Sequence, residues 1–331
     1  MTDRLSSTLK MKKLLTIVVI TFLSNLMMGE KNPDDSFKTN TSKTDKIFQF
    51  TWANDFPFHT DYYFTNGVQF SYFSPVFKYS PLNFILLPSS NIGKVYYGLS
   101  FTQRIFTPAD LNYTNINSND RPFSSYLLLG SNKISLNPKS RYKLSSAFSI
   151  GLIGKPSGGQ YFQNSIHDIL PTSPHVSGWK NQIGNDIALS YYAEFEKGIF
   201  QFSGFELNGS VFSQIGVPHS EMGINSYIRI GRFEDYFANL GLNRKINWQA
   251  FLFAGISGKT VLYNATLEGG LFNESQQFTQ DAIKPFVVDF VSGFSVVHRN
   301  FKIELGQHSL TPEFNGGLSH RWAYLSVHVG L

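Results

Sequence analysis

Apolar and polar residues alternate with a period of two along most of this chain. Polar residues separate Phe48, Phe50 and Trp52 near the start, and the same spacing separates Val327 and Val329 near the end. Alternation of this kind is typical of β-strands with one apolar and one polar face. It predicts twelve strands, at residues 46–55, 64–75, 94–105, 123–135, 142–153, 186–196, 200–213, 221–232, 246–262, 284–297, 301–311 and 321–331.

The length and composition of these strands favour a membrane barrel over a soluble β-sandwich, which would also alternate. Strands of about 9–12 residues cross a bilayer at a tilt, whereas strands in globular proteins are about 5–6 residues long. Their apolar faces carry Phe, Tyr, Trp, Leu and Val, which suit lipid, and their other faces carry residues that suit a polar lumen. The sequence therefore predicts an all-β fold, a 12-stranded antiparallel transmembrane β-barrel.

The connections between the predicted strands differ in length. Lys197-Gly198 and residues 298–300 are short and predict turns on the periplasmic side. Three connections are long: 106–122, 154–185 and 263–283. If the strand count is strict, we do not expect all three on the outer side, and we place 154–185 there.

The first residues resemble a targeting segment. Basic residues at Lys10 to Lys13 precede a mostly apolar run from Leu14 to Leu23, which is typical of a secretory signal peptide. This run is shorter than the roughly 20 apolar residues of a transmembrane helix. We therefore expect a signal peptide at 1–29, a flexible polar tether at 30–45 and a barrel domain at 46–331.

Composition supports an exported membrane protein. Only 15% of the 331 residues are charged, against roughly 25% in soluble domains. The mean hydropathy of −0.14 argues against a bundle of membrane helices. Outside residues 1–29 there are 24 basic and 22 acidic residues, which gives little support for a nucleic-acid partner. The absence of cysteine excludes disulfide scaffolds, thiolate zinc sites and cysteine nucleophiles.

The first predicted hairpin contains one candidate site. Alternation places the Asp55 side chain on the inward face of its strand and Thr65 on the inward face of the next. A carboxylate and a hydroxyl would then point into the outer mouth of the barrel, where such oxygen ligands suit a hard cation such as Ca²⁺. Asp and Thr are also ordinary turn residues, and the pattern alone leaves both interpretations open.

The connection 154–185 contains a second candidate site. Residues 160–170 can form a short helix, in which Gln163 and Asn164 share the face of His167. A histidine oriented by amide neighbours can act as a general base. A single histidine in a loop is more commonly a solvated or capping residue, so the residues alone also leave this role open.

Several short motifs occur in one order along the mature chain. They are Asn54-Asp55, Thr60 to Gly67, Gln103 to Asp110, Asp120 to Phe123, Gln163 to His167, Gly178 to Ile183 and Thr311 to Phe314. Together they resemble the LpxR family of lipid A deacylases, and the resemblance covers about residues 46–331. Its specificity comes from the number and order of the motifs, since each one alone is weak.

The resemblance implies a calcium-dependent esterase in the outer membrane of a Gram-negative bacterium, with its active site on the extracellular side. Such an enzyme removes the 3′-linked acyloxyacyl group from the lipid A of lipopolysaccharide. The family pattern makes His167 the base that activates water, with Gln163 and Asn164 as its supporting neighbours. It also places Asn54, as a catalytic residue, with Asp55 and Thr65 around the Ca²⁺ ion that stabilises the oxyanion.

The chain departs from the family pattern at two positions. Some members carry a lysine in the loop that corresponds to Leu111 to Asp120, where this chain has none; Arg121 is the nearest cation, and we take it as a supporting residue. Some members also carry a glutamate shortly after the histidine, where this chain has Asp168. These differences bear on efficiency, metal preference and the acyl position that is cut.

One other function remains open, and a second is disfavoured. A small non-enzymatic porin, or an inactive family member, would have the same barrel pattern. An outer-membrane phospholipase with a serine nucleophile would need a His-x-Ser-Asn motif, which the sequence lacks. For the phosphates of lipid A, four cations are available around the predicted outer mouth: Arg104, Arg121, Lys155 and Lys180.

Overall fold

The computed structural model describes residues 46–58, 60, 62–89, 93–111, 120–169, 176–242, 247–272, 278 and 282–331. The side chains of residues 166, 167 and 169 are outside this description, and so are the predicted signal peptide (1–29) and tether (30–45). Among the described residues, no helix has the length and hydrophobicity to cross a membrane.

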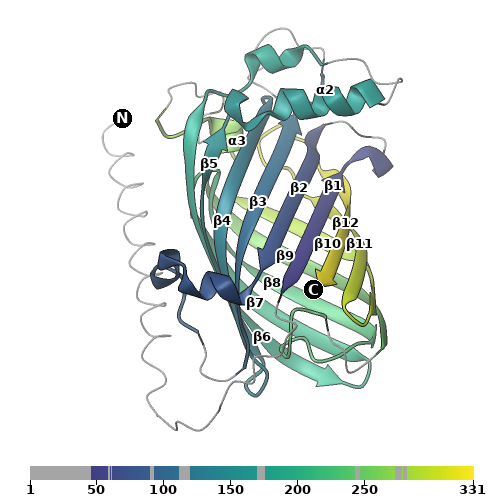
Figure 1. The fold of residues 1–331 in the computed structure, drawn as a ribbon. Helices are drawn as coiled ribbons and strands as arrows, with labels where there is room; N and C mark the ends of the chain where they lie inside the picture. The colour runs from purple at the N-terminus through teal and green to yellow at the C-terminus, as the bar shows by residue number, and fades with distance from the viewer. Residues whose placement is uncertain are drawn as a thin grey trace, which may run out of the picture. The chain divides into compact units, whose positions relative to one another are not determined.

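The described chain forms a closed antiparallel barrel (Figure 1), in which each strand pairs with its neighbours in sequence and the first pairs with the last. The strands are β1 (Ile47–Asn54), β2 (Tyr63–Phe73), β3 (Val95–Thr107), β4 (Ser124–Asn137), β5 (Tyr142–Ile153), β6 (Asp186–Phe202), β7 (Phe205–Gly216), β8 (His219–Arg232), β9 (Trp248–Asn264), β10 (Phe286–His298), β11 (Phe301–Leu310) and β12 (His320–Gly330). The predicted all-β, 12-stranded barrel is confirmed.

Short helices occupy the connections between strands. They are η1 (Phe56–Phe58), η2 (Pro75–Tyr79), η3 (Pro81–Phe84), η4 (Lys155–Ser157), α2 (Gly159–Ile169), η5 (Gly178–Asn181) and α3 (Ala265–Glu268). The helix predicted at 160–170 is α2. Its start is fixed by Gly159, where a Cβ atom would overlap the side chains of Ser125 and Trp179.

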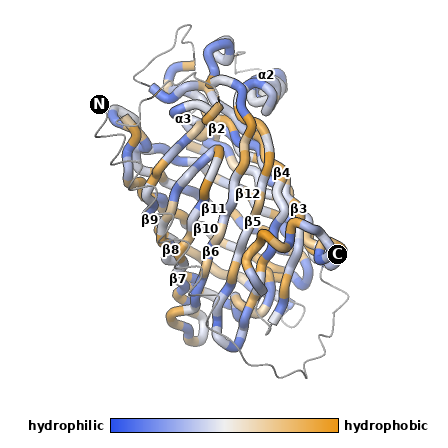
Figure 2. Tube along the Cα trace, turned by 90° about the vertical axis from the view of Figure 1, so that its left-hand side faces the viewer, coloured by the Kyte–Doolittle hydropathy of each residue, from blue (hydrophilic) through white to orange (hydrophobic). Residues whose placement is uncertain are grey.

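The barrel wall separates apolar from polar side chains, as the alternation predicts. Large apolar side chains such as Phe70, Leu129 and Ile150 are exposed on its outside, and hydrophobic and hydrophilic residues follow one another along the strands (Figure 2). On the inside, Thr51 and Ser326 share a hydrogen bond of 2.8 Å between their hydroxyl groups. Lipid requires this arrangement, in which the exterior is apolar, the interior is hydrogen-bonded and every strand edge is paired.

All three long connections lie at one end of the barrel, here named the α2 end (Figure 1). The expectation that they would not share an end is wrong. Each connection joins an odd-numbered strand to the next even-numbered one, and in an up-and-down barrel all such connections share an end. The opposite end holds the two chain ends of the barrel, where the Leu331 amide donates to the Lys46 carbonyl over 2.8 Å.

The predicted turn at Lys197-Gly198 is also wrong. Strand β6 continues to Phe202 and turns into β7 at residues 203–204. The β6–β7 pairing shifts register between Gly198 and Phe200, so the glycine marks a β-bulge inside a long strand. The turn predicted at 298–300 is confirmed, since β10 ends at His298 and β11 begins at Phe301.

Side chains fill both ends of the barrel interior. Near the α2 end the core contains Ala53, Phe64, Phe106, Tyr126, Ile153, Ile183, Ala188, Val217 and Ala265. At the opposite end the β8–β9 connection enters the barrel, where the Tyr236 hydroxyl lies 2.5 Å from Lys143 Nζ and 3.2 Å from a Glu196 oxygen. Phe237 is fully buried there, and Leu242 packs on Phe251 and Val297.

The barrel also contains a polar cavity of about 420 Å³, which is lined by Glu194, Glu221 and Lys259, among others.

Candidate active site

Asn54 forms hydrogen bonds that hold the two sides of the β1–β2 hairpin together. Its side-chain oxygen accepts the Phe56 backbone N–H over 2.7 Å, and its side-chain nitrogen donates to the Thr65 carbonyl over 2.8 Å. The first contact fixes the start of η1, and the second holds the end of β1 against the start of β2. Asn54 therefore sets the shape of the hairpin at the α2 end.

Asp55 is the residue that follows β1, and only 2% of its surface is exposed. One carboxylate oxygen accepts the Tyr62 backbone N–H over 3.2 Å and lies 3.3 Å from the Thr60 hydroxyl, which donates to it. The turn thus holds a buried carboxylate in one orientation. His59 and Asp61, in the same turn, lie outside the described residues.

Thr65 lies at an irregularity in the sheet. The β2–β3 pairing shifts register between Phe64 and Asn66, so alternation cannot be continued through Thr65. Phe64 packs in the interior core, while the buried Thr65 hydroxyl lies 2.7 Å from the hydroxyl of Thr107. Thr65 therefore contacts β3 from a bulge in β2, which a simple period of two does not predict.

Gln163 and Asn164 anchor α2. The buried Gln163 side-chain oxygen accepts the indole N–H of Trp179 over 2.7 Å, and Trp179 belongs to η5. The Asn164 side-chain oxygen accepts the Val176 backbone N–H over 3.2 Å. Both residues therefore fix the helix to the chain that follows it. His167 lies on α2, two turns from its start, and its side chain is outside the described residues.

The connection between β5 and β6, here named the α2 connection, packs on β3 and β4. Gln103 of β3 donates from its side-chain nitrogen to the Ser157 carbonyl over 2.6 Å, and the Ser157 hydroxyl lies 2.5 Å from that of Ser125 on β4. Strand β3 also carries Thr107, the partner of Thr65. The hairpin motif and the α2 motif are thus brought to neighbouring strands at the same end of the barrel.

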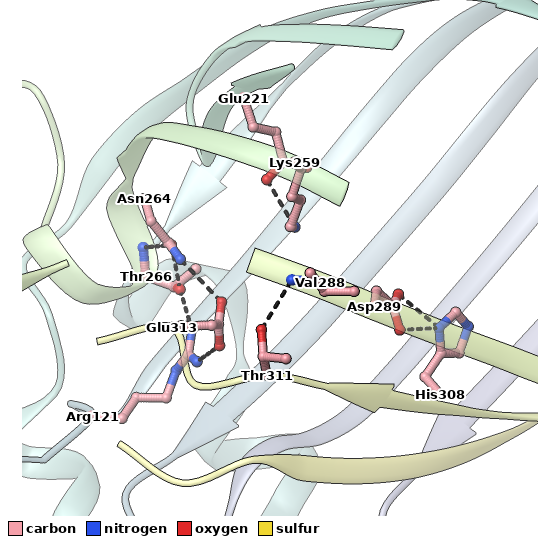
Figure 3. Close-up of polar contacts among 10 residues, drawn as sticks. All are labelled: Arg121, Glu221, Lys259, Asn264, Thr266, Val288, Asp289, His308, Thr311 and Glu313. Atoms are coloured by element: carbon pink, nitrogen blue, oxygen red, sulfur yellow. Dashed lines mark hydrogen bonds and ion pairs between the residues drawn. The ribbon is translucent and has the colours of Figure 1, made fainter. Parts of the chain in front are cut away.

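Arg121 lies inside the α2 end (Figure 3), and only 1% of its surface is exposed. Its guanidinium forms an ion pair with Glu313 and donates to the Thr266 hydroxyl over 2.6 Å. It also lies 4.4 Å from the ring centre of Phe106. Burial alone would raise the pKa of the Glu313 carboxyl, but nearby positive charge, first that of Arg121, lowers this pKa to about 2.

Further polar pairs line the interior beside this ion pair (Figure 3). Lys259 lies 2.9 Å from Glu221, and the His308 imidazole lies 2.9 Å from Asp289. These residues and Glu313 were not predicted to belong to the site. Glu313 could have been predicted as a site residue, because it lies in one of the ordered motifs and its partner Arg121 lies in another. The lumen pairs carry no motif, although alternation along β9 and β10 does place Lys259 and Asp289 inward.

The four cations considered for lipid A phosphates fall into two groups. Arg104, Lys155 and Lys180 are exposed. Arg121 is buried and engaged with Glu313, so its position suits support of the barrel end better than contact with a phosphate.

The oxygen atoms of the hairpin have the chemistry of a hard-cation site. No cluster of three or more His, Cys, Asp or Glu side chains that could hold a metal occurs among the described residues. The carboxylate of Asp55, the hydroxyl of Thr65 and the amide oxygen of Asn54 are ligand types that Ca²⁺ takes together with carbonyl oxygens and water. The donor set therefore suits Ca²⁺ and offers none of the soft ligands that zinc or copper prefer.

The closed barrel, its apolar outer wall and its motif-bearing rim define an outer-membrane β-barrel protein. The family model described as "Outer membrane protein LpxR" matches residues 15–331, and the chain belongs to the LpxR family. This membership supports an outer-membrane protein that modifies lipid A.

The solved structure of a Salmonella protein supports this barrel fold. LpxR from Salmonella typhimurium matches with a TM-score of 0.70 and 19% identity, over 86% of this chain and 100% of that one. The β domain of the Bordetella autotransporter BrkA matches with a TM-score of 0.48 and 8% identity, over 86% and 99%. Curated protein sequences give no significant match.

Proposed function

We propose that this protein is a calcium-dependent lipid A deacylase, which hydrolyses the 3′-linked acyloxyacyl ester of lipopolysaccharide at the outer leaflet. One observation carries the proposal. In a chain matched by the LpxR family over residues 15–331, the hairpin that holds a buried Asp55 carboxylate and the helix that contains His167 lie at the same end of the barrel.

The reaction is the addition of water to an ester. His167 takes a proton from the water molecule while the water oxygen attacks the carbonyl carbon of the ester. The bond to the 3′ oxygen of the sugar then breaks, and that oxygen takes up a proton to become a hydroxyl group. The products are the free acyloxyacyl acid and a lipid A that has lost this group.

The hairpin supplies the electrostatic part of the site. Asp55 and Thr65 would hold the Ca²⁺ ion, with Asn54 beside them, and the bound ion would supply positive charge for the oxyanion that forms on the ester. The chain's own contribution is to fix these oxygens before substrate arrives. Asn54 holds the two strands together, and the Tyr62 N–H orients the Asp55 carboxylate.

The α2 connection positions the general base, His167. Gln163 and Asn164 hold α2 through Trp179 and Val176, so they act as positioning residues for His167. A base must lie within hydrogen-bond reach of the proton it removes, and small displacements of a catalytic group reduce rates strongly. The packing of the helix on β3 and β4 is therefore part of the proposed catalytic apparatus.

The substrate's own location fits a site at the rim of a barrel. The acyl chains of lipopolysaccharide can remain in the membrane beside the apolar outer wall, so that only the ester and the sugar phosphates need to reach the rim. The exposed Arg104, Lys155 and Lys180 are available for these phosphates. This arrangement requires the α2 end to face the extracellular side.

Mass spectrometry of lipid A from cells that express the protein tests this function. We expect the loss of one acyloxyacyl unit with the wild-type chain, and intact lipid A with His167→Ala or after calcium chelation. Gln160→Ala is the matched control, because Gln160 is an exposed residue of the same helix. Intact lipid A from cells with abundant, folded wild-type protein would refute the proposal.

A further inference from the structure

The connection between β2 and β3 starts and ends at the end of the barrel opposite α2 (Figure 1) and carries exposed apolar side chains. It contains η2 and η3, which begin at Pro75 and end at Phe84. The exposed fractions are 62% for Val76, 85% for Tyr79 and 84% for Phe84. Apolar side chains this exposed, gathered in one short segment, indicate an interaction surface rather than chance.

This connection lies against the outside of the barrel. The ring of Phe77 packs edge-on against that of Tyr72, 6.0 Å between centres, and the Leu87 backbone N–H donates to the Ser146 hydroxyl over 3.1 Å. Tyr72 shares a face of β2 with the exposed Phe70, and Ser146 shares a face of β5 with the exposed Ile150. The connection therefore covers part of the wall that otherwise faces lipid.

The wall beneath the connection is polar. Ser131, Lys133 and Ser135 lie on the face of β4 that carries the exposed Leu129, yet all three are buried, and Lys133 is only 8% exposed. Their neighbour on β5, Ser146, is buried as well and accepts the Leu87 hydrogen bond. Helix η3 contacts β4. A lysine and serines on the lipid face of a barrel are costly unless they are covered.

The connection therefore covers a polar surface of the barrel with an apolar one. It covers the polar part of β4 and β5, and its own exposed apolar side chains are Val76, Tyr79, Leu82 and Phe84. The exposed Lys78 stands next to Tyr79. Aromatic residues with a flanking lysine are typical of the boundary between lipid headgroups and acyl chains, where the rings enter the acyl region and the amine reaches phosphate.

We propose that residues 75–86, here named the β2–β3 belt, bind the phospholipids of the membrane leaflet at the end opposite α2. Tyr79 and Phe84 insert below the headgroups, and Lys78 pairs with lipid phosphate. The belt is continuous with the lipid-facing wall on which it lies, which favours lipid as its occupant over a second copy of the chain. This inference does not depend on the proposed reaction.

Site-specific fluorescence tests the belt directly, because the chain contains no cysteine and a single introduced one can be labelled alone. Phe84→Cys and Tyr79→Cys are labelled with an environment-sensitive fluorophore in vesicles of phosphatidylethanolamine and phosphatidylglycerol. Lys139→Cys is the control, since Lys139 is exposed in the polar β4–β5 turn at the same end. Both belt side chains project away from the protein, so their replacement should leave folding intact.

We expect labels at 84 and 79 to emit at shorter wavelength than the label at 139, and to be quenched by nitroxide-bearing lipids but not by aqueous iodide. The label at 139 should show the reverse. Quenching of the belt labels by iodide would overturn the proposal. Protection from both quenchers that disappears as the protein is diluted in lipid would also overturn it, because a second copy would then be the occupant.

Discussion

The guanidinium of Arg121 pairs with the carboxylate of Glu313 inside the α2 end of the barrel (Figure 3). The two residues are 192 positions apart and belong to the β3–β4 and β11–β12 connections. Arg121 also donates to Thr266 of α3, so three connections meet at one buried cation. The pair therefore closes the α2 end across the barrel and supports the rim on which the candidate site lies.

Breaking this pair should destabilise the barrel strongly. Glu313→Leu leaves the Arg121 charge buried without its partner, which typically costs about 3–5 kcal/mol. Urea unfolding from lipid vesicles, followed by tryptophan fluorescence, should show a lower midpoint for Glu313→Leu than for the wild type. The double variant Arg121→Met with Glu313→Leu is the control and should recover much of the loss. An unchanged midpoint for Glu313→Leu would contradict the role assigned to the pair.

The same pair should make stability depend on pH only under acidic conditions. The pKa of Glu313 falls from 4.5 to about 2 on folding, so the unfolded chain binds this proton more readily than the folded protein. The stabilisation is therefore complete above about pH 4.5 and is lost as pH falls through about 2. The difference in unfolding free energy between wild type and Glu313→Gln should shrink across that window. A difference that disappears near neutral pH would contradict this assignment.

The hydrogen bond from Trp179 to Gln163 should control the mobility of α2. Gln163→Leu leaves a buried indole N–H without an acceptor, at a cost of roughly 1–3 kcal/mol. We expect faster amide hydrogen exchange in α2 and η5, with little change in the strands. Gln163→Glu, which keeps an acceptor oxygen in a side chain of the same shape, is the control and should exchange more slowly than Gln163→Leu. Equal exchange in the wild type and Gln163→Leu would show that this contact does not hold the helix.

The filled interior predicts that the protein is not an open pore. The β8–β9 connection enters one end through Tyr236 and Phe237, and the core around Phe64 and Phe106 fills the other. The wild-type protein in planar bilayers should therefore show no steady ion conductance, while an open porin measured in parallel conducts. Stable conductance steps from the folded wild-type chain would favour the porin function that the sequence pattern left open.

The strands could be predicted from sequence because each one has a lipid face and a lumen face, and this difference appears directly as a period of two. The prediction failed where the backbone departs from that period. At Gly198 a glycine that resembled a turn is a bulge within β6, and at Thr65 a bulge interrupts the alternation. Bulges depend on pairing with the neighbouring strand, which a single segment does not reveal.

The candidate residues could be named from their motifs, but their contacts could not be predicted. Asn54 and Gln163 stand where their motifs place them, yet the partners Thr65 and Trp179 that give them structural roles come from other segments. From sequence, Arg121 is a candidate cation at the outer mouth, and only the structure shows that it is buried beside Glu313. Long-range pairs of this kind leave no local pattern.

The central claim is that water, activated by His167, hydrolyses an acyl ester of lipid A. The most direct measurement uses purified protein in vesicles with lipopolysaccharide and Ca²⁺, in water enriched in oxygen-18, followed by mass spectrometry of both products. The account predicts a lipid A that lacks its 3′-linked acyloxyacyl group and a released acid that carries one oxygen-18 atom, with neither product formed by His167→Ala. Intact lipid A with the folded wild-type protein, or equal turnover by His167→Ala, would contradict it.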